Sequence, residues 1–162
     1  MNDLKKIITF FLCLNLVLLS SCGKTYTYSE TKSGSSIQEI KQSLGKKPAN
    51  ETTDKNGNEF LTYEECPYLG YKGTSTYCFS DDKMQFSKWE YKSENASKAK
   101  EVYDKIVDEK QKKYGTGKDT QSEGVYMCNW NEGTNSIALT CITNEDTTVV
   151  TLTEIISANE GK

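Results

Sequence analysis

Cysteine is the residue type with the widest chemistry in this chain of 162 residues, because the chain has no histidine and all 20 of its basic residues are lysine. Without imidazole and guanidinium groups there is no histidine general base, no histidine metal ligand and no bidentate phosphate clamp. The 23 acidic residues outnumber the basic ones and give a net charge of −3, so the chain is a poor nucleic-acid binder. We expect a protein that is not an enzyme and has no catalytic residue, metal or cofactor.

The first two cysteines are Cys13, which lies in an apolar N-terminal segment, and Cys22, which follows it. Residues 7–19 are almost entirely apolar and follow Lys5 and Lys6, and the segment is shorter than the roughly 20 residues that span a bilayer. The sequence Leu19-Ser20-Ser21-Cys22 resembles the lipobox of bacterial lipoproteins. This resemblance implies that residues 1–21 are a signal peptide, that it is cleaved before Cys22, and that the Cys22 thiol carries lipid. It implies a protein held by acyl chains on the extracytoplasmic side of the cell membrane or outer membrane.

The remaining four cysteines are Cys66, Cys78, Cys128 and Cys141. An even number of cysteines in an exported domain is typical of disulfides. Four cysteines allow three connectivities, and we favour Cys66–Cys78 and Cys128–Cys141 because each pair flanks a predicted hairpin. A four-thiolate zinc site is disfavoured because the sequence has no Cys-x-x-Cys spacing.

Two other motifs resemble known sites without matching them. The window from Asp54 to Glu65 spaces oxygen ligands as an EF-hand loop does, but its sixth position is Glu59 instead of glycine. Ser80 and Lys83 have the Ser-x-x-Lys spacing of penicillin-recognising enzymes, but they lie at the end of a predicted strand. We interpret both motifs as turns.

Aromatic residues are the other candidates for contact with a partner. Tyr68 and Tyr71 lie in a loop that contains glycines and is closed by the first predicted disulfide, and a rigid loop that presents tyrosine suits a protein-binding surface. Trp89 and Tyr91 share one face of a predicted strand. The alternative is that these rings fill the core of a small domain. The candidate partner-binding residues are Tyr68, Tyr71, Lys72, Trp89, Tyr91 and Trp130.

Two amphipathic helices are predicted. Ser36 and Glu39 fit a capping box at the start of a helix over residues 37–44. Asn95 can cap a second helix, which has apolar residues at spacings of three and four and ends near Gly115.

Six strands are expected from β-prone runs between turn signals. With the helices they form two repeats, about residues 36–92 and 95–156, each a helix followed by three strands. We therefore expect one α+β domain over residues 36–156, an antiparallel sheet with both helices on one face and two disulfides. Residues 22–35 are interpreted as a flexible tether and residues 157–162 as a disordered tail. The predicted strands cover residues 60–63, 76–79, 84–92, 125–130, 137–143 and 148–156.

The tandem architecture resembles the secreted β-lactamase inhibitory proteins. The first helix, which ends in Leu44-Gly45-Lys46-Lys47-Pro48, resembles that of the small lipoprotein of the outer-membrane β-barrel assembly machine. The resemblance implies a binding module with a concave sheet and does not identify a target. Together with the lipobox, it leads us to expect a non-enzymatic, membrane-anchored module that binds an unidentified envelope protein, as an assembly factor or an inhibitor. The alternative is a lipoprotein that binds a glycan or small molecule on Trp89, Tyr91 or Trp130.

Overall fold

A computed structural model provides the structure of the domain. The predicted signal peptide (1–21), the lipidation site Cys22, most of the tether (22–35) and the tail (157–162) lie outside its described residues and remain predictions. Within the part that is described, no helix is long and apolar enough to cross a membrane. The structure describes residues 27–28, 34–133, 135–144 and 148–156.

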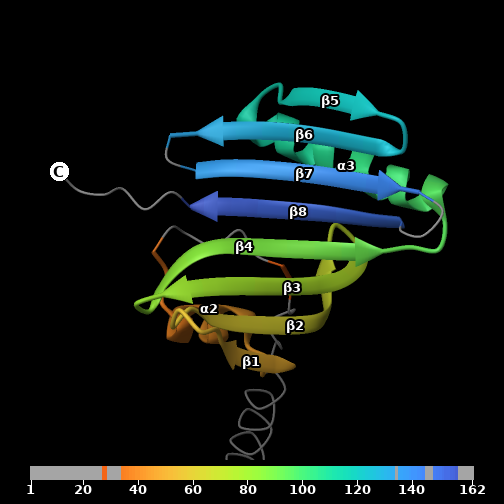
Figure 1. The fold of residues 1–162 in the computed structure, drawn as a ribbon. Coiled ribbons are helices and arrows are strands. Elements are labelled where there is room, and N and C mark those ends of the chain that lie inside the picture. Colours follow the sequence, from red (N-terminus) through yellow and green to blue (C-terminus); the bar gives the residue numbers. More distant parts are fainter. Residues whose placement is uncertain (1–26, 29–33, 134, 145–147, 157–162) are drawn as a thin grey trace, which may run out of the picture.

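The described residues form eight strands that pair in a single antiparallel sheet (Figure 1). The strand order in space is β1-β2-β3-β4-β8-β7-β6-β5, so each half of the sheet is a meander. The last strands of the two halves, β4 and β8, pair with each other at the centre. The α+β class with an antiparallel sheet is thus confirmed. The strands are Asn50–Thr53 (β1), Glu59–Tyr68 (β2), Tyr71–Ser80 (β3), Lys83–Lys92 (β4), Lys118–Ser122 (β5), Val125–Glu132 (β6), Asn135–Thr143 (β7) and Thr148–Ile156 (β8).

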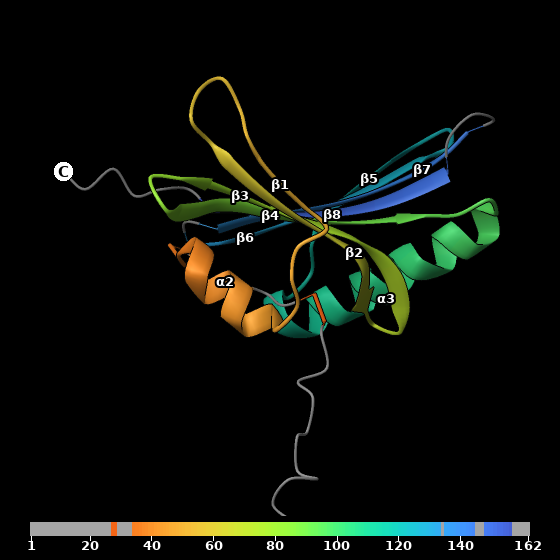
Figure 2. The same cartoon turned by 90° about the horizontal axis from the view of Figure 1, so that it is seen from below.

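Both helices lie on the same side of the sheet, as predicted (Figure 2). Helix α2 spans Ile37–Leu44 and helix α3 spans Ala96–Tyr114. The capping box of α2 is formed, because Glu39 N donates to the Ser36 hydroxyl and Ser36 N donates to the Glu39 carboxylate. Asn95 caps α3 by accepting a backbone hydrogen bond from its first turn.

Each half of the domain contains one strand more than the sequence predicted. The missed strands, β1 and β5, lie at the two edges of the sheet, and all their residues are exposed. Their sequences, Asn-Glu-Thr-Thr and Lys-Asp-Thr-Gln-Ser, contain no apolar residue, so no hydrophobic pattern marks them. Each pairs with one neighbouring strand, β1 with β2 and β5 with β6.

The hydrophobic core lies between the sheet and the two helices. Alternate residues of the strands point toward the helices, among them Tyr63, Tyr77, Trp89 and Leu152, all of which are fully buried. Ile106 of α3 packs against them from the other side. The buried face of β2 and β3 therefore points toward the helices.

Tyr28 belongs to this core, although it lies inside the predicted tether. Its ring contacts Tyr68 edge-on at 5.2 Å between centroids and stacks on Tyr77 at 6.3 Å. Its hydroxyl is 2.9 Å from the hydroxyl of Ser87, and its N–H donates to the carbonyl of Pro67 at 2.8 Å. Burial raises the pKa of Tyr28 well above its ordinary value. The chain therefore joins the folded domain at Tyr28, before α2 begins.

The predicted Cys66–Cys78 disulfide is wrong. In the β2–β3 pairing Cys66 lies opposite Gly73, whereas Cys78 lies opposite Phe60, so the two residues are far apart along the hairpin. They also lie on opposite faces of the sheet, Cys66 toward the helices and Cys78 beside Phe60 on the other side. Both residues are buried, and neither forms a disulfide.

The predicted Cys128–Cys141 disulfide is also wrong. Cys128 lies opposite Leu139 and Cys141 lies opposite Tyr126, which makes the cysteines diagonal neighbours on one face. Diagonal neighbours are about 7–8 Å apart, whereas disulfides need Cα separations of about 4.4–6.8 Å. Both thiols are free and buried, and burial raises the pKa of Cys128 to about 12 and that of Cys141 to about 11.

A buried ion pair links helix α3 to the sheet. The Nζ atom of Lys110 lies 2.8 Å from Oε1 of Glu154, and the Lys110 side chain is fully buried. The ammonium group also lies 5.8 Å from the ring centre of Tyr68 and 5.7 Å from that of Tyr114. Because Glu154 is on β8, this pair lies under the centre of the sheet, where the two halves meet.

Candidate binding surface

Three of the six predicted partner-binding residues are buried, and the prediction is wrong for them. The exposed fraction is 0% for Trp89, 3% for Trp130 and 8% for Tyr68. The indole nitrogens are used internally, since Trp89 Nε1 donates to the Cys66 carbonyl at 3.0 Å and Trp130 Nε1 to the Gly115 carbonyl at 3.1 Å. These rings fill the core, which was the alternative interpretation.

Tyr71 and Tyr91 are half-buried and belong to a cluster on α3. The Tyr71 hydroxyl donates to the Glu101 carboxylate at 2.7 Å, and its ring lies 5.0 Å from the Nζ atoms of both Lys98 and Lys105. The rings of Tyr71 and Tyr91 pack edge-on with centroids 5.7 Å apart. Tyr71 therefore fastens the β2–β3 hairpin to α3 and is not free to insert into a partner.

No described helix or strand covers the side of the sheet that faces away from α2 and α3 (Figure 2). We call this side the open face and define it by four rows of residues that cross the strands from β2, β3 or β4 toward β6. Each row follows directly from the strand register, in which residues directly opposite each other share a face. The rows are Phe60, Cys78, Phe86, Ile155, Ser136 and Asn131; Thr62, Thr76, Lys88, Thr153, Ala138 and Asn129; Thr74, Glu90, Thr151, Thr140 and Met127; and Lys92, Val149, Ile142 and Val125.

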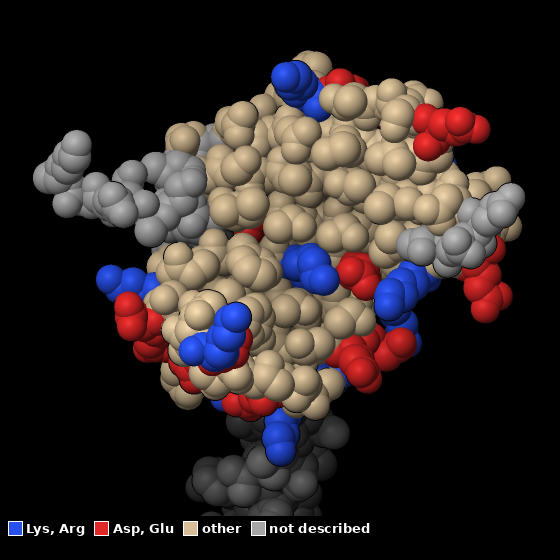
Figure 3. All heavy atoms as spheres, viewed as in Figure 1, with Lys and Arg blue, Asp and Glu red and all other residues tan. Residues whose placement is uncertain are grey.

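The open face carries few charges. Three of its 21 residues are charged, against 27% of the whole chain, and all three lie on β4: Lys88, Glu90 and Lys92. Lys88 Nζ and Lys92 Nζ lie 3.3 Å and 3.6 Å from the Glu90 carboxylate. Figure 3 views this side and shows a broad uncharged area over β6, β7 and β8. Lys72, the last predicted partner-binding residue, is exposed at the tip of the β2–β3 hairpin.

Apolar and threonine side chains fill the rest of the open face. The two large apolar residues that are exposed in the described part of the chain, Met127 and Ile155, both belong to it, with exposed fractions of 36% and 46%. The rings of Phe60 and Phe86 meet edge-on at 6.5 Å in the first row, where Cys78 lies between them.

Threonine is the most frequent residue type of the open face. It offers a methyl group for apolar contact and a hydroxyl group that can donate and accept, and its side chain has little rotamer freedom to lose. This composition combines apolar area with hydrogen-bonding capacity at low entropic cost. The threonines are Thr62, Thr74, Thr76, Thr140, Thr151 and Thr153.

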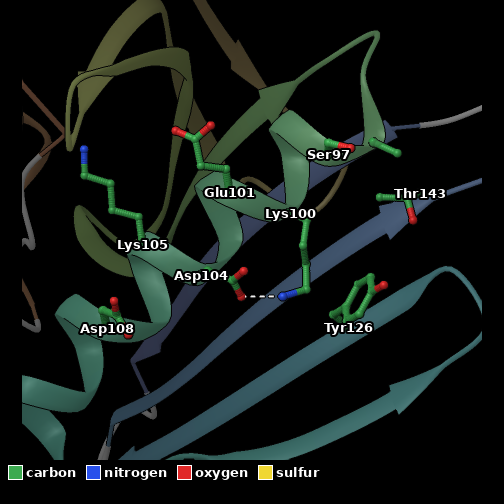
Figure 4. A pocket seen from close by; sticks show the side chains of 9 residues that line it. Ser97, Lys100, Glu101, Asp104, Lys105, Asp108, Tyr126 and Thr143 are labelled. Carbon is green, nitrogen blue, oxygen red and sulfur yellow. Dashed lines mark hydrogen bonds and ion pairs between the residues drawn. The ribbon is translucent and has the colours of Figure 1, made fainter.

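A hollow of about 710 Å³ beside α3 is a second candidate site (Figure 4). Its centre is formed by Lys100, Asp104 and Tyr126. The Lys100 ammonium forms an ion pair with Asp104 and lies 5.0 Å from the ring centre of Tyr126. Since these groups already contact one another and the hollow opens to solvent, it provides no ready anchor for a ligand.

The window that resembles an EF-hand loop is a turn. The Asp54 carboxylate accepts bonds from the backbone N–H groups of Asn56 and Asn58 and from Asn58 Nδ2, at 2.8, 2.9 and 3.0 Å. These hydrogen bonds lower the pKa of Asp54, with the Asn58 side chain the largest contributor. The carboxylate stabilises the β1–β2 turn, and no three metal-ligating residues gather within the described ranges.

The open face was not predicted from the sequence. One signal was available, because Thr-Ser-Thr in β3 and Thr-Leu-Thr in β8 each place two threonines on the face opposite a buried residue. These threonines indicate one continuous face only when it is known that β3 and β8 pair with β4 on its two sides. Comparisons with protein-family models, with curated proteins and with solved structures found no match.

Proposed function

We propose that the protein is a membrane-anchored, extracytoplasmic protein-binding module, an envelope assembly factor or inhibitor, and that it binds through the open face. One observation carries this proposal: the uncovered side of the sheet is poor in charge and holds both exposed large apolar residues, Met127 and Ile155. Depletion of charge distinguishes the core of protein interfaces from other surfaces. Exposed apolar area on a folded domain commonly marks a site of interaction.

The proposed anchor rests on the sequence around Cys22. Acyl chains on this cysteine would confine the domain to the membrane surface and so raise the effective concentration of partners in the same membrane. A moderate intrinsic affinity of the open face would then suffice for binding. Replacing Cys22 by alanine should move the protein from the membrane fraction to the soluble fraction, and retention of the variant in the membrane would contradict the anchor.

A glycan or small-molecule function is not proposed. It required Trp89, Tyr91 or Trp130 as a stacking platform, and two of these rings are buried with their nitrogens hydrogen-bonded. Tyr91 stacks on Trp89 with ring centres 6.1 Å apart and is itself half-buried, so only part of its ring is available to a ligand.

In-cell photo-crosslinking tests the proposed surface. The full chain carries a photoreactive residue either at Thr151, in the middle of the open face, or at Asp108, which is exposed on α3. We expect one dominant protein adduct from position 151 and none from position 108. Equal labelling at both positions, or no protein adduct at 151, would refute a binding role for the open face.

A further inference from the structure

We propose that the open face binds the open face of a second copy of this chain. This proposal rests on the proposed function, because it names the partner of the same surface. The arrangement is a face-to-face pair of sheets related by a twofold axis, in which the same patch of both copies forms the contact. Twisted sheets pack face to face in this way in β-sandwiches, with strand directions within about 30° of each other.

The area of the open face matches that of a specific dimer. Six long strands, β2, β3, β4, β8, β7 and β6, lie side by side. With about 4.8 Å between strands and about 6.7 Å between successive rows, the 21 residues cover about 700 Å². Each partner in a standard-size interface contributes about 800 Å².

The charges of β4 complement themselves across a twofold axis. Lys88 lies in the second row and Glu90 in the third, on the same strand. The twofold axis lies between the two sheets, runs perpendicular to the strands and passes between the second and third rows. It places each strand over the same strand of the other copy. It also places the second row of one copy over the third row of the other. Lys88 of each copy then faces Glu90 of the other, so the central charges form two ion pairs between copies.

On β3 and β8 the same axis also matches uncharged residues. Thr76 of β3 faces Thr74 of the other copy, and Thr153 of β8 faces Thr151, so hydroxyl groups meet hydroxyl groups. The first row meets the fourth, which brings the exposed Ile155 against Val149 of the other copy. No position of β8 then opposes a charge.

The position of Tyr28 is compatible with two copies in one membrane. Tyr28 packs on strands of the first half of the domain, through Pro67 of β2 and Ser87 of β4. The proposed axis runs along the direction in which the strands are stacked, so it keeps the β1 edges of both copies at the same end. Tyr28 of both copies therefore lies in the half of the dimer nearer that end, so one membrane there can hold both anchors.

Charge exchange tests this arrangement directly. Full-length chains with two different tags are co-expressed and extracted in detergent, one carrying Lys88→Glu and the other Glu90→Lys. The Lys88→Glu chain carries acidic residues at both positions 88 and 90, and the Glu90→Lys chain carries basic residues at both. In the mixed pair, each acidic residue faces a basic residue of the other chain. We expect the mixed pair to co-purify about tenfold more than either variant with itself, because like charges face each other in the homotypic pairs.

A matched control moves the same charges to the other side of the molecule. Lys112→Glu and Asp108→Lys alter exposed residues of α3 and should give no preference for the mixed pair. Melting temperatures of all variants confirm that each is folded. Absence of a preference in the Lys88→Glu and Glu90→Lys mixture would overturn the proposed register.

A second measurement uses the unaltered surface. Photo-crosslinking from position 151 should join two copies, and mass spectrometry should find the adduct on the segment that contains Thr153. Failure of the two tagged wild-type chains to co-purify, with a different envelope protein captured at position 151, would refute the dimer and leave the proposed function standing. Capture of no protein at that position would refute both.

Discussion

Lys110 of α3 and Glu154 of β8 form an ion pair inside the protein, with 2.8 Å between Nζ and Oε1 and no exposure of the lysine side chain. Removing one partner leaves an uncompensated charge in the interior, so Lys110→Met should lower the free energy of unfolding by about 3–5 kcal/mol. Adding Glu154→Leu should recover most of this loss, because the charge that lacks a partner is then gone. Urea unfolding of the single and double variants measures both effects.

A surface ion pair provides the control for this prediction. Lys100 pairs with Asp104 on the exposed side of α3, and Lys100→Met should cost less than about 1 kcal/mol. If Lys110→Met and Lys100→Met have equal effects, the buried pair does not stabilise the contact between α3 and the sheet.

Reduction should leave the protein unchanged. None of the four cysteines of the described domain forms a disulfide, so a reducing agent should not lower the melting temperature. Thiol reagents should react slowly with the native protein and rapidly after unfolding, because Cys66, Cys128 and Cys141 are completely buried. A drop of several degrees on reduction, or peptides linked through Cys128 and Cys141, would restore the disulfide that the strand register contradicts.

Stability should fall at alkaline pH. Burial raises the pKa of Cys128 to about 12 and that of Cys141 to about 11, whereas an unfolded thiol ionises near pH 8.5. Above that pH the unfolded chain binds fewer protons than the native one, so the free energy of unfolding decreases until the native thiols also ionise. Burial also raises the pKa of Tyr63 to about 12, which acts in the same direction.

Urea unfolding at a series of pH values measures this dependence. We expect a steady free energy of unfolding up to about pH 8 and a decline from about pH 9 toward pH 11. The variant Cys128→Ala should show a shallower decline, because one of the shifted groups is absent. An equal slope in the variant would show that this thiol does not cause the effect.

Tyr28 should stabilise the domain from outside its helices and strands. Tyr28→Ala removes a buried ring and should cost about 3–5 kcal/mol, as other large-to-small core substitutions do. Tyr28→Phe removes only the hydrogen bond to Ser87 and should cost about 1 kcal/mol. Limited trypsin digestion provides an independent readout, because cleavage between residues 24 and 35 should accelerate in Tyr28→Ala and not in Tyr28→Phe.

Local sequence signals predicted the elements that bury apolar side chains. The capping box of Ser36 and Glu39 marked the start of α2, and the period of apolar residues marked α3. The buried strands were found by their aromatic and β-branched residues. The edge strands β1 and β5 were missed because their stability comes from pairing with a neighbour, and their polar sequences contain no trace of it.

The prediction of partner-binding residues was wrong for a related reason. An aromatic ring at an alternating strand position shows that one face is apolar, but the sequence does not say whether a helix covers that face. Trp89 is buried against Tyr68 and Tyr91, and Trp130 contacts the segment that follows α3 through Gly115, whereas nothing in the sequence marked Thr151 on the uncovered side. Disulfide pairing failed because spacing along the chain identifies a hairpin and not the register within it, as Cys66 and Cys78 demonstrate.

The burial of Tyr28 would limit how far a copy anchored through Cys22 can stand from a membrane. Cys22, the proposed lipid site, precedes Tyr28 by six positions, and six extended residues reach about 20 Å. A domain of this size is wider than that, with a diameter on the order of 35–40 Å. An anchored copy therefore stays in the layer next to the lipid headgroups. It can bind only molecules that reach this layer, so height above the bilayer restricts its partners.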